Sequence, residues 1–111
     1  MISEVHQQQA IAVIQAVLQA IHEKNYTAIP KLIDRSDLPM DELEEFVEET
    51  LRLSGQKIIP PFVEANAAFF EDEDGEGFEV EYLLTEEMVL SFEFFLLEGS
   101  LHSVLEDIEA N

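Results

Sequence analysis

The chain has no cysteine and no tryptophan, and it has only four glycines and four prolines in 111 residues. The lack of cysteine excludes disulfide bonds and metal sites built from thiolates. No phosphate-binding glycine loop and no Gly-x-Ser-x-Gly motif is present, so the common signatures of nucleotide-binding proteins and of serine hydrolases are missing.

Long apolar runs are also missing. The longest apolar stretch, residues 88–97, is interrupted by Ser91 and Glu93 and is about half the ~20 residues that a membrane-spanning helix needs. No basic region precedes an apolar run near residue 1, so we do not expect a signal peptide. The sequence therefore predicts a protein of the cytoplasm that does not act in a membrane.

Positive charge is absent from the second half of the chain. Residues 1–57 contain all five Lys and Arg beside ten Asp and Glu, whereas residues 58–111 contain fifteen acids and no cation. The two halves thus carry −5 and −15, which gives the total of −20. Nucleic acids and anionic lipid surfaces are bound by clustered cations, so both are disfavoured as partners. A basic protein is the partner class that this charge favours.

Apolar residues, by contrast, are plentiful at 47%, and eight Phe supply much of their volume. A chain of this length with such a share of apolar residues is predicted to form a single domain, residues 1–111. Pro60-Pro61 interrupts regular structure. It is expected to separate a helical half, residues 1–57, from a strand half, residues 58–111.

Apolar residues recur every three or four positions over 4–24 and 39–53, and both ranges are predicted to be helices. A short helix is predicted over 27–34, because Thr27 can cap it and Pro30 falls in its first turn. Residues 34–37 are expected to form a turn.

Alternating apolar residues predict strands over 78–84 and 88–97, and a further strand over 67–71 is possible. Residues 101–109 fit one face of a helix as well as a strand, and Glu98-Gly99 favours the strand because it resembles a hairpin turn. The expected fold class is α+β, with three N-terminal helices packed on a C-terminal antiparallel sheet of three or four strands.

The acidic run over 71–77 invites a calcium interpretation, which its spacing does not support. With Gly75 at the sixth position of an EF-hand loop the first position is Phe70, and with Gly77 there the twelfth is Leu83. Neither apolar side chain can bind calcium. A hydrated hairpin loop is the better interpretation.

Other metal-binding and catalytic patterns are equally weak. The glutamates of the third helix lack the histidine that di-iron helices place three residues further on. His6, His22 and His102 have no metal-ligand spacing. We therefore expect no metal and no cofactor, and catalytic residues remain unassigned.

One feature favours an interaction. Residues 88–97 are apolar on both faces near their end, and the face opposite the predicted core carries Leu83, Val89, Phe95 and Leu97. A sheet face exposed to solvent is usually polar, so this candidate interface is expected to be covered. A second copy of the chain, another partner, a ligand, or residues 61–70 of the same chain could cover it.

The order of elements resembles the NTF2-like or cystatin-like cone, and in particular a group of uncharacterised, mostly bacterial NTF2-like proteins. The resemblance rests on residues 16–33, 38–51, the Ile58-Ile59-Pro60-Pro61 segment and the ending Leu105-Glu106-Asp107-Ile108-Glu109. It spans roughly residues 10–110. It implies a pocket between the first helix and the sheet, for which Tyr82, Phe92 and Phe94 are the candidates. NTF2-like enzymes line this pocket with polar groups, and here Tyr82 is the only obvious one.

Two classes of function are compatible with these observations. The preferred hypothesis is a non-enzymatic acidic interaction domain, expected to be a homodimer and able to bind a basic protein. The alternative is an NTF2-like ligand-binding protein or enzyme, whose pocket would use Tyr82 with His22 or His102. A carboxylate-rich metal buffer is a third and weaker hypothesis.

Overall fold

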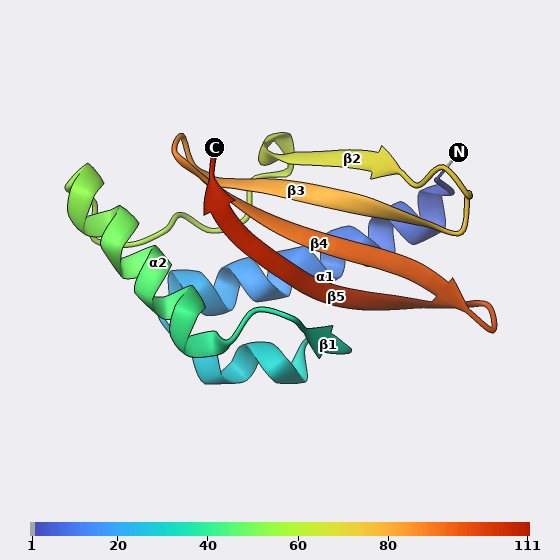
Figure 1. Cartoon of the computed structure of the whole chain (residues 1–111), viewed down its shortest axis with the longest axis horizontal. Coiled ribbons are helices and arrows are strands. Elements are labelled where there is room, and N and C mark those ends of the chain that lie inside the picture. The colour runs from blue at the N-terminus through green and yellow to red at the C-terminus, as the bar shows by residue number, and fades with distance from the viewer. Residues whose placement is uncertain (1) are drawn as a thin grey trace.

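The computed structural model describes residues 2–111, which form an α+β domain (Figure 1). Its elements follow in the order α1 (Glu4–His22), the 3-10 helix η1 (Tyr26–Lys31), β1 (Arg35–Ser36), α2 (Met40–Ser54), the 3-10 helix η2 (Glu64–Asn66), β2 (Ala67–Glu71), β3 (Gly77–Thr85), β4 (Met88–Leu97) and β5 (Ser100–Ala110).

The strands form one mixed sheet in the order β1-β5-β4-β3-β2. The pairs from β2 to β5 are antiparallel, and β1 runs parallel to β5, with Arg35 opposite Val104. In Figure 1, α1 lies behind the long strands and α2 lies at one end of the sheet. The face toward the viewer carries no helix, and we call it the outer face.

Local sequence explains where the helices begin and end. The hydroxyl of Ser3 accepts a hydrogen bond from the backbone N–H of His6 at 3.1 Å, which caps α1. Gly55 ends α2 with a φ of 75°, in the left-handed region that glycine adopts without steric cost.

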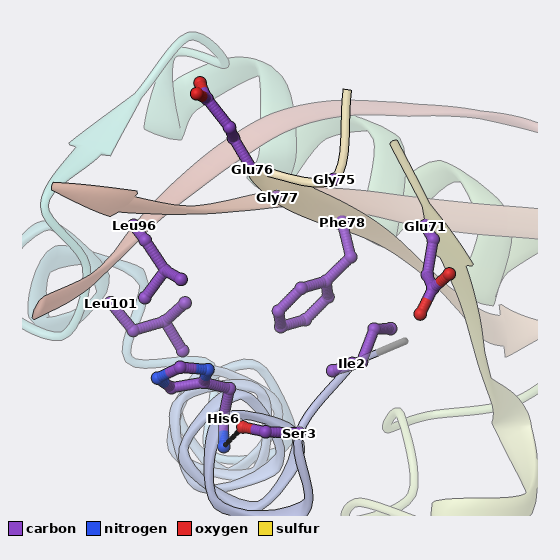
Figure 2. A pocket seen from close by; sticks show the side chains of 10 residues that line it. All are labelled: Ile2, Ser3, His6, Glu71, Gly75, Glu76, Gly77, Phe78, Leu96 and Leu101. Carbon is purple, nitrogen blue, oxygen red and sulfur yellow. Dashed lines mark hydrogen bonds between the residues drawn. The ribbon is translucent and has the colours of Figure 1, made fainter. Parts of the chain in front are cut away.

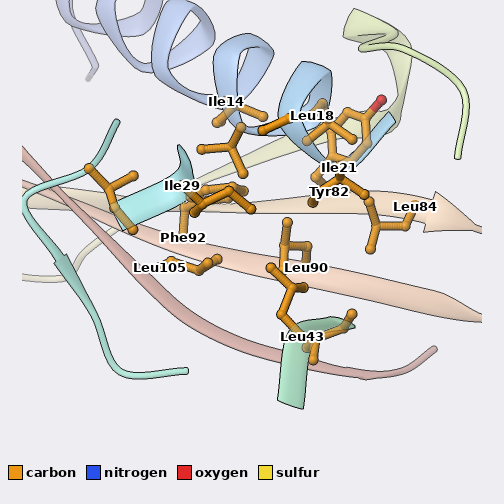
Figure 3. Packing of buried hydrophobic residues seen from close by; sticks show 14 of the residues in the cluster. Ile14, Leu18, Ile21, Ile29, Leu43, Tyr82, Leu84, Leu90, Phe92 and Leu105 are labelled. Carbon is orange, nitrogen blue, oxygen red and sulfur yellow. The ribbon is translucent and has the colours of Figure 1, made fainter. Parts of the chain in front are cut away.

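The core lies between α1 and the inner face of the sheet (Figure 3). Side chains alternate across a strand, so every second residue of β3 and β4 faces α1. Ile14, Leu18 and Ile21 of α1 pack against this layer. The sheet contributes large buried side chains to the same core: Phe78, Tyr82, Leu84, Leu90, Phe92, Phe94 and Leu105.

Most predicted elements are confirmed, and two need correction. Residues 100–110 form a strand, which settles the open choice between strand and helix. The predicted helix over 27–34 is a shorter 3-10 helix. The predicted turn over 34–37 contains β1, so the sheet has five strands and is mixed, where three or four antiparallel strands were expected.

Within residues 2–111, no helix is both long enough and apolar enough to cross a membrane.

Candidate functional site

All four residues of the candidate interface lie on the outer face. The residues of β3 and β4 that alternate with them point into the core. Leu83 and Val89 are directly opposite each other near one end of the β3–β4 pair. Phe95 and Leu97 lie toward the other end of β4.

These four side chains differ in exposure. Leu97 is 55% exposed, while Leu83, Val89 and Phe95 are half-buried by their neighbours in the sheet. Phe95 also stacks on the ring of His102 across the β4–β5 pair, with ring centroids 5.5 Å apart. The side chains of the candidate interface are not covered by a helix, because α1 lies on the inner face. Residues 67–71 do not cover them either, because they form β2 at the edge of the sheet.

Three carboxylates lie between the two apolar ends. Glu79 is directly opposite Glu93 in the β3–β4 pair. Glu106 joins them from β5, beside an irregularity in the register at Ser91 and Phe92. One carboxylate oxygen from each residue lies within 4.8 Å of the others. We call Glu79, Glu93 and Glu106 the carboxylate trio.

Burial and the neighbouring carboxylates change the acidity of two members of the trio, Glu93 and Glu106. Burial raises the pKa of Glu93 to about 7, with a further contribution from the neighbouring carboxylate of Asp72. Burial likewise raises the pKa of Glu106 to about 7, and the side chain of Glu79 adds to the effect through a shared hydrogen bond. Oxygen Oε1 of Glu106 is buried and has no hydrogen-bond partner. The site therefore disfavours its own negative charge.

No cation of residues 2–111 forms an ion pair with the trio. Arg35 lies nearest in the sheet register, but its guanidinium donates to Asp37 at 3.0 Å. Arg52 is paired with Glu49, and Lys24 is paired with Glu48. Both glutamates lie on α2. The trio thus has two properties of a cation-binding site: clustered carboxylates, and no neutralising side chain of the chain itself.

The trio could also contact a metal ion, although it is a poor metal site. Calcium takes six to eight oxygen ligands, and the trio offers three side chains on an open sheet. The three side chains are half-buried, and acidic groups at a protein surface are common without a metal.

The candidate pocket residues lie in the core. Phe92 and Phe94 are fully buried, and Tyr82 is 2% exposed. The hydroxyl of Tyr82 accepts a hydrogen bond from the backbone N–H of Val63 at 2.9 Å, and its ring stacks on Phe62. Tyr82 therefore holds the segment before β2 in place.

A hollow of about 280 Å³ does lie between the start of α1 and the sheet (Figure 2). The ring of His6 points toward Leu96 and Leu101, and Phe78 and Ile2 form the wall beside it. A second hollow continues on the other side of His6 and includes Phe94. The sequence reasoning missed this place, because nothing in the spacing of His6 connects it with the β4–β5 hairpin.

The histidines of the sequence analysis lie apart from one another. His22 Nδ1 is 2.7 Å from the carbonyl oxygen of Ile59, to which it donates when protonated there. His102 Nδ1 is 3.5 Å from Asp34, a carboxyl whose pKa is lowered by the hydrogen bond from the backbone N–H of Ser103. Both contacts fasten loops to the rest of the domain.

A comparison of the chain with protein-family models, with curated proteins and with solved structures finds no match. The resemblance to NTF2-like proteins thus stays a prediction.

Proposed function

We propose that this chain is a non-enzymatic interaction domain that binds a basic segment of another protein on its outer sheet face. The observation that carries the proposal is the carboxylate trio, with Glu93 and Glu106 at pKa values raised to about 7 and without a cation of the chain beside them. A Lys or Arg of the partner would supply the missing charge and favour ionisation of both groups.

The surroundings of the trio fit such a partner. A basic side chain has an apolar stem and a charged end. Leu83 and Val89 on one side of the trio, and Phe95 and Leu97 on the other, can contact stems and neighbouring apolar residues. The net charge of −20 would also speed the encounter with a basic protein at low ionic strength.

A second copy of the chain, the homodimer of the sequence analysis, is a less suitable occupant of this face. Two outer faces related by a twofold axis through the trio would place Glu79, Glu93 and Glu106 against the same groups of the other copy. Like charges brought together in this way oppose association. A basic partner has no such cost.

The hollow beside His6 supports a second candidate function, a small-ligand-binding protein of NTF2-like architecture in the cytoplasm. The hollow lies between α1 and the sheet, where the resemblance implies a pocket, and His6 borders it on the α1 side beside Leu101. Its residues differ from the candidates Tyr82 and Phe92. The interaction domain is therefore preferred.

A defined basic probe tests the preferred function. Hexalysine is titrated into the protein at low salt, and binding is followed by calorimetry and by amide shifts in NMR spectra. The double variant Glu93→Gln/Glu106→Gln is expected to weaken binding about three- to tenfold, as the loss of two exposed ion pairs implies.

The matched control is Glu86→Gln/Glu87→Gln, which removes the same number of carboxylates at the exposed turn between β3 and β4. It should bind hexalysine nearly as well as the original chain. Equal weakening in both variants would show that only total charge matters. Self-association in light scattering, without peptide binding, would favour the homodimer instead.

A further inference from the structure

The acidic surface continues past the trio into a groove between α2 and the end of β5. The groove measures about 490 Å³ and is lined by Glu42, Glu45, Phe46, Glu49, Asp107 and Ile108. Asp107 directly follows Glu106 of the trio, beside the register irregularity of β5. Two consecutive residues of β5 therefore belong to neighbouring acidic sites: Glu106 to the carboxylate trio and Asp107 to the groove.

Phe46 is the unusual member of this groove. The buried side chains of α2 are Leu43, Val47, Thr50 and Leu51, and they form the face that packs on the domain. Phe46 lies beside that face and is 44% exposed. Part of the Phe46 ring is therefore in contact with water, and a partner that covers this apolar surface would gain from its burial.

The carboxylates around Phe46 are only partly engaged. Glu49 accepts from Arg52 at 2.6 Å and 3.2 Å, and Asp107 accepts from the backbone N–H of Ile108 at 2.8 Å. Within residues 2–111, the carboxylates of Glu42 and Glu45 have neither an ion-pair partner nor a hydrogen-bond partner. The groove therefore combines an open aromatic ring with unpaired negative charge.

We propose that this groove receives an arginine side chain of the basic segment that binds the outer face. A guanidinium is planar, stacks on aromatic rings and donates to carboxylates through a fork of N–H groups. Phe46 supplies the ring, and Glu42 and Glu45 supply acceptors. A lysine ammonium can use the carboxylates but gains less from the ring. This inference rests on the proposed function and adds a preference for arginine at one place.

The test compares hexaarginine with hexalysine on the full chain. Arginine is expected to bind about two- to fivefold more tightly, as an exposed cation–π contact implies, and to shift the amide signals of α2. Phe46→Leu keeps an apolar side chain and should abolish the preference. Phe46→Tyr keeps the aromatic ring and should retain it.

The charge of the groove is tested by Glu42→Gln/Glu45→Gln, which should weaken hexaarginine about three- to fivefold. Equal affinity for the two peptides in the original chain, or an arginine preference that survives in Phe46→Leu, would overturn the inference. Neither result affects the proposed function, which is contradicted when Glu93→Gln/Glu106→Gln binds both peptides as tightly as the original chain does.

Discussion

Glu79 and Glu93 are directly opposite each other in the β3–β4 pair, on a sheet face where no element of the domain covers them. Like charges directly opposite in a sheet are destabilising. Glu106 brings a third carboxylate to the same place. The chain therefore maintains an arrangement that costs stability, which is a common property of binding sites.

The pH dependence of stability follows from this arrangement. The pKa values of Glu93 and Glu106 are raised from 4.5 to about 7 in the folded chain. The folded chain thus binds more protons than the unfolded one between these values, and the two groups lower stability as pH rises from about 4.5 to about 7. We expect the melting temperature to fall between pH 5.5 and pH 7.5.

The double variant Glu93→Gln/Glu106→Gln should show a flatter profile and melt a few degrees higher at pH 7.5, since roughly 1 kcal/mol shifts the melting temperature of such a domain by about 4–8 °C. Glu86→Gln/Glu87→Gln should keep the slope of the original chain. A slope that is unchanged in the first variant would contradict the assignment to the trio.

Salt should stabilise the protein. The −20 charge is spread over a small surface, and ions screen such repulsion over about 8 Å at physiological strength. We expect the melting temperature to rise between 20 mM and 300 mM NaCl at pH 7.5. A flat or falling response in a thermal scan would indicate that the acids are well spaced or locally paired.

Gly77 is predicted to resist substitution, because a Cβ built there would lie 2.5 Å from the carbonyl oxygen of Phe94 and 2.9 Å from Oδ2 of Asp72. The first of these atoms is backbone and cannot easily move away. Gly77→Ala should therefore lower the free energy of unfolding by about 1–3 kcal/mol, measured by urea denaturation. Gly75→Ala is not an equivalent control, because Gly75 has a φ of 75° and alanine would be strained there. Ala68→Gly, at an exposed position of β2, makes the reverse substitution of alanine by glycine in a strand. If the urea midpoint of Gly77→Ala equals that of the original chain, β3 and β4 can move apart at this point without a loss of stability, and the prediction is contradicted.

The sequence predicted the long elements well, because each depends on local periodicity. It did not predict β1, since Arg35 and Ser36 become a strand only by pairing with Val104 and Leu105, far along the chain. The opposition of Glu79 and Glu93 could have been found, since a hairpin centred on Glu86 places them in register. The approach of Glu106 was harder to predict, because it depends on the irregular register beside Ser91 and Phe92.

The most direct measurement is the pKa of Glu93 and of Glu106, obtained by following side-chain carboxyl carbons in an NMR titration with and without hexalysine. We predict values near 7 for the free chain, which fall when the peptide is bound because its cations stabilise the ionised carboxylates. Values near 4.5 in the free chain, or values that the bound peptide leaves unchanged, would contradict the proposed role of the trio.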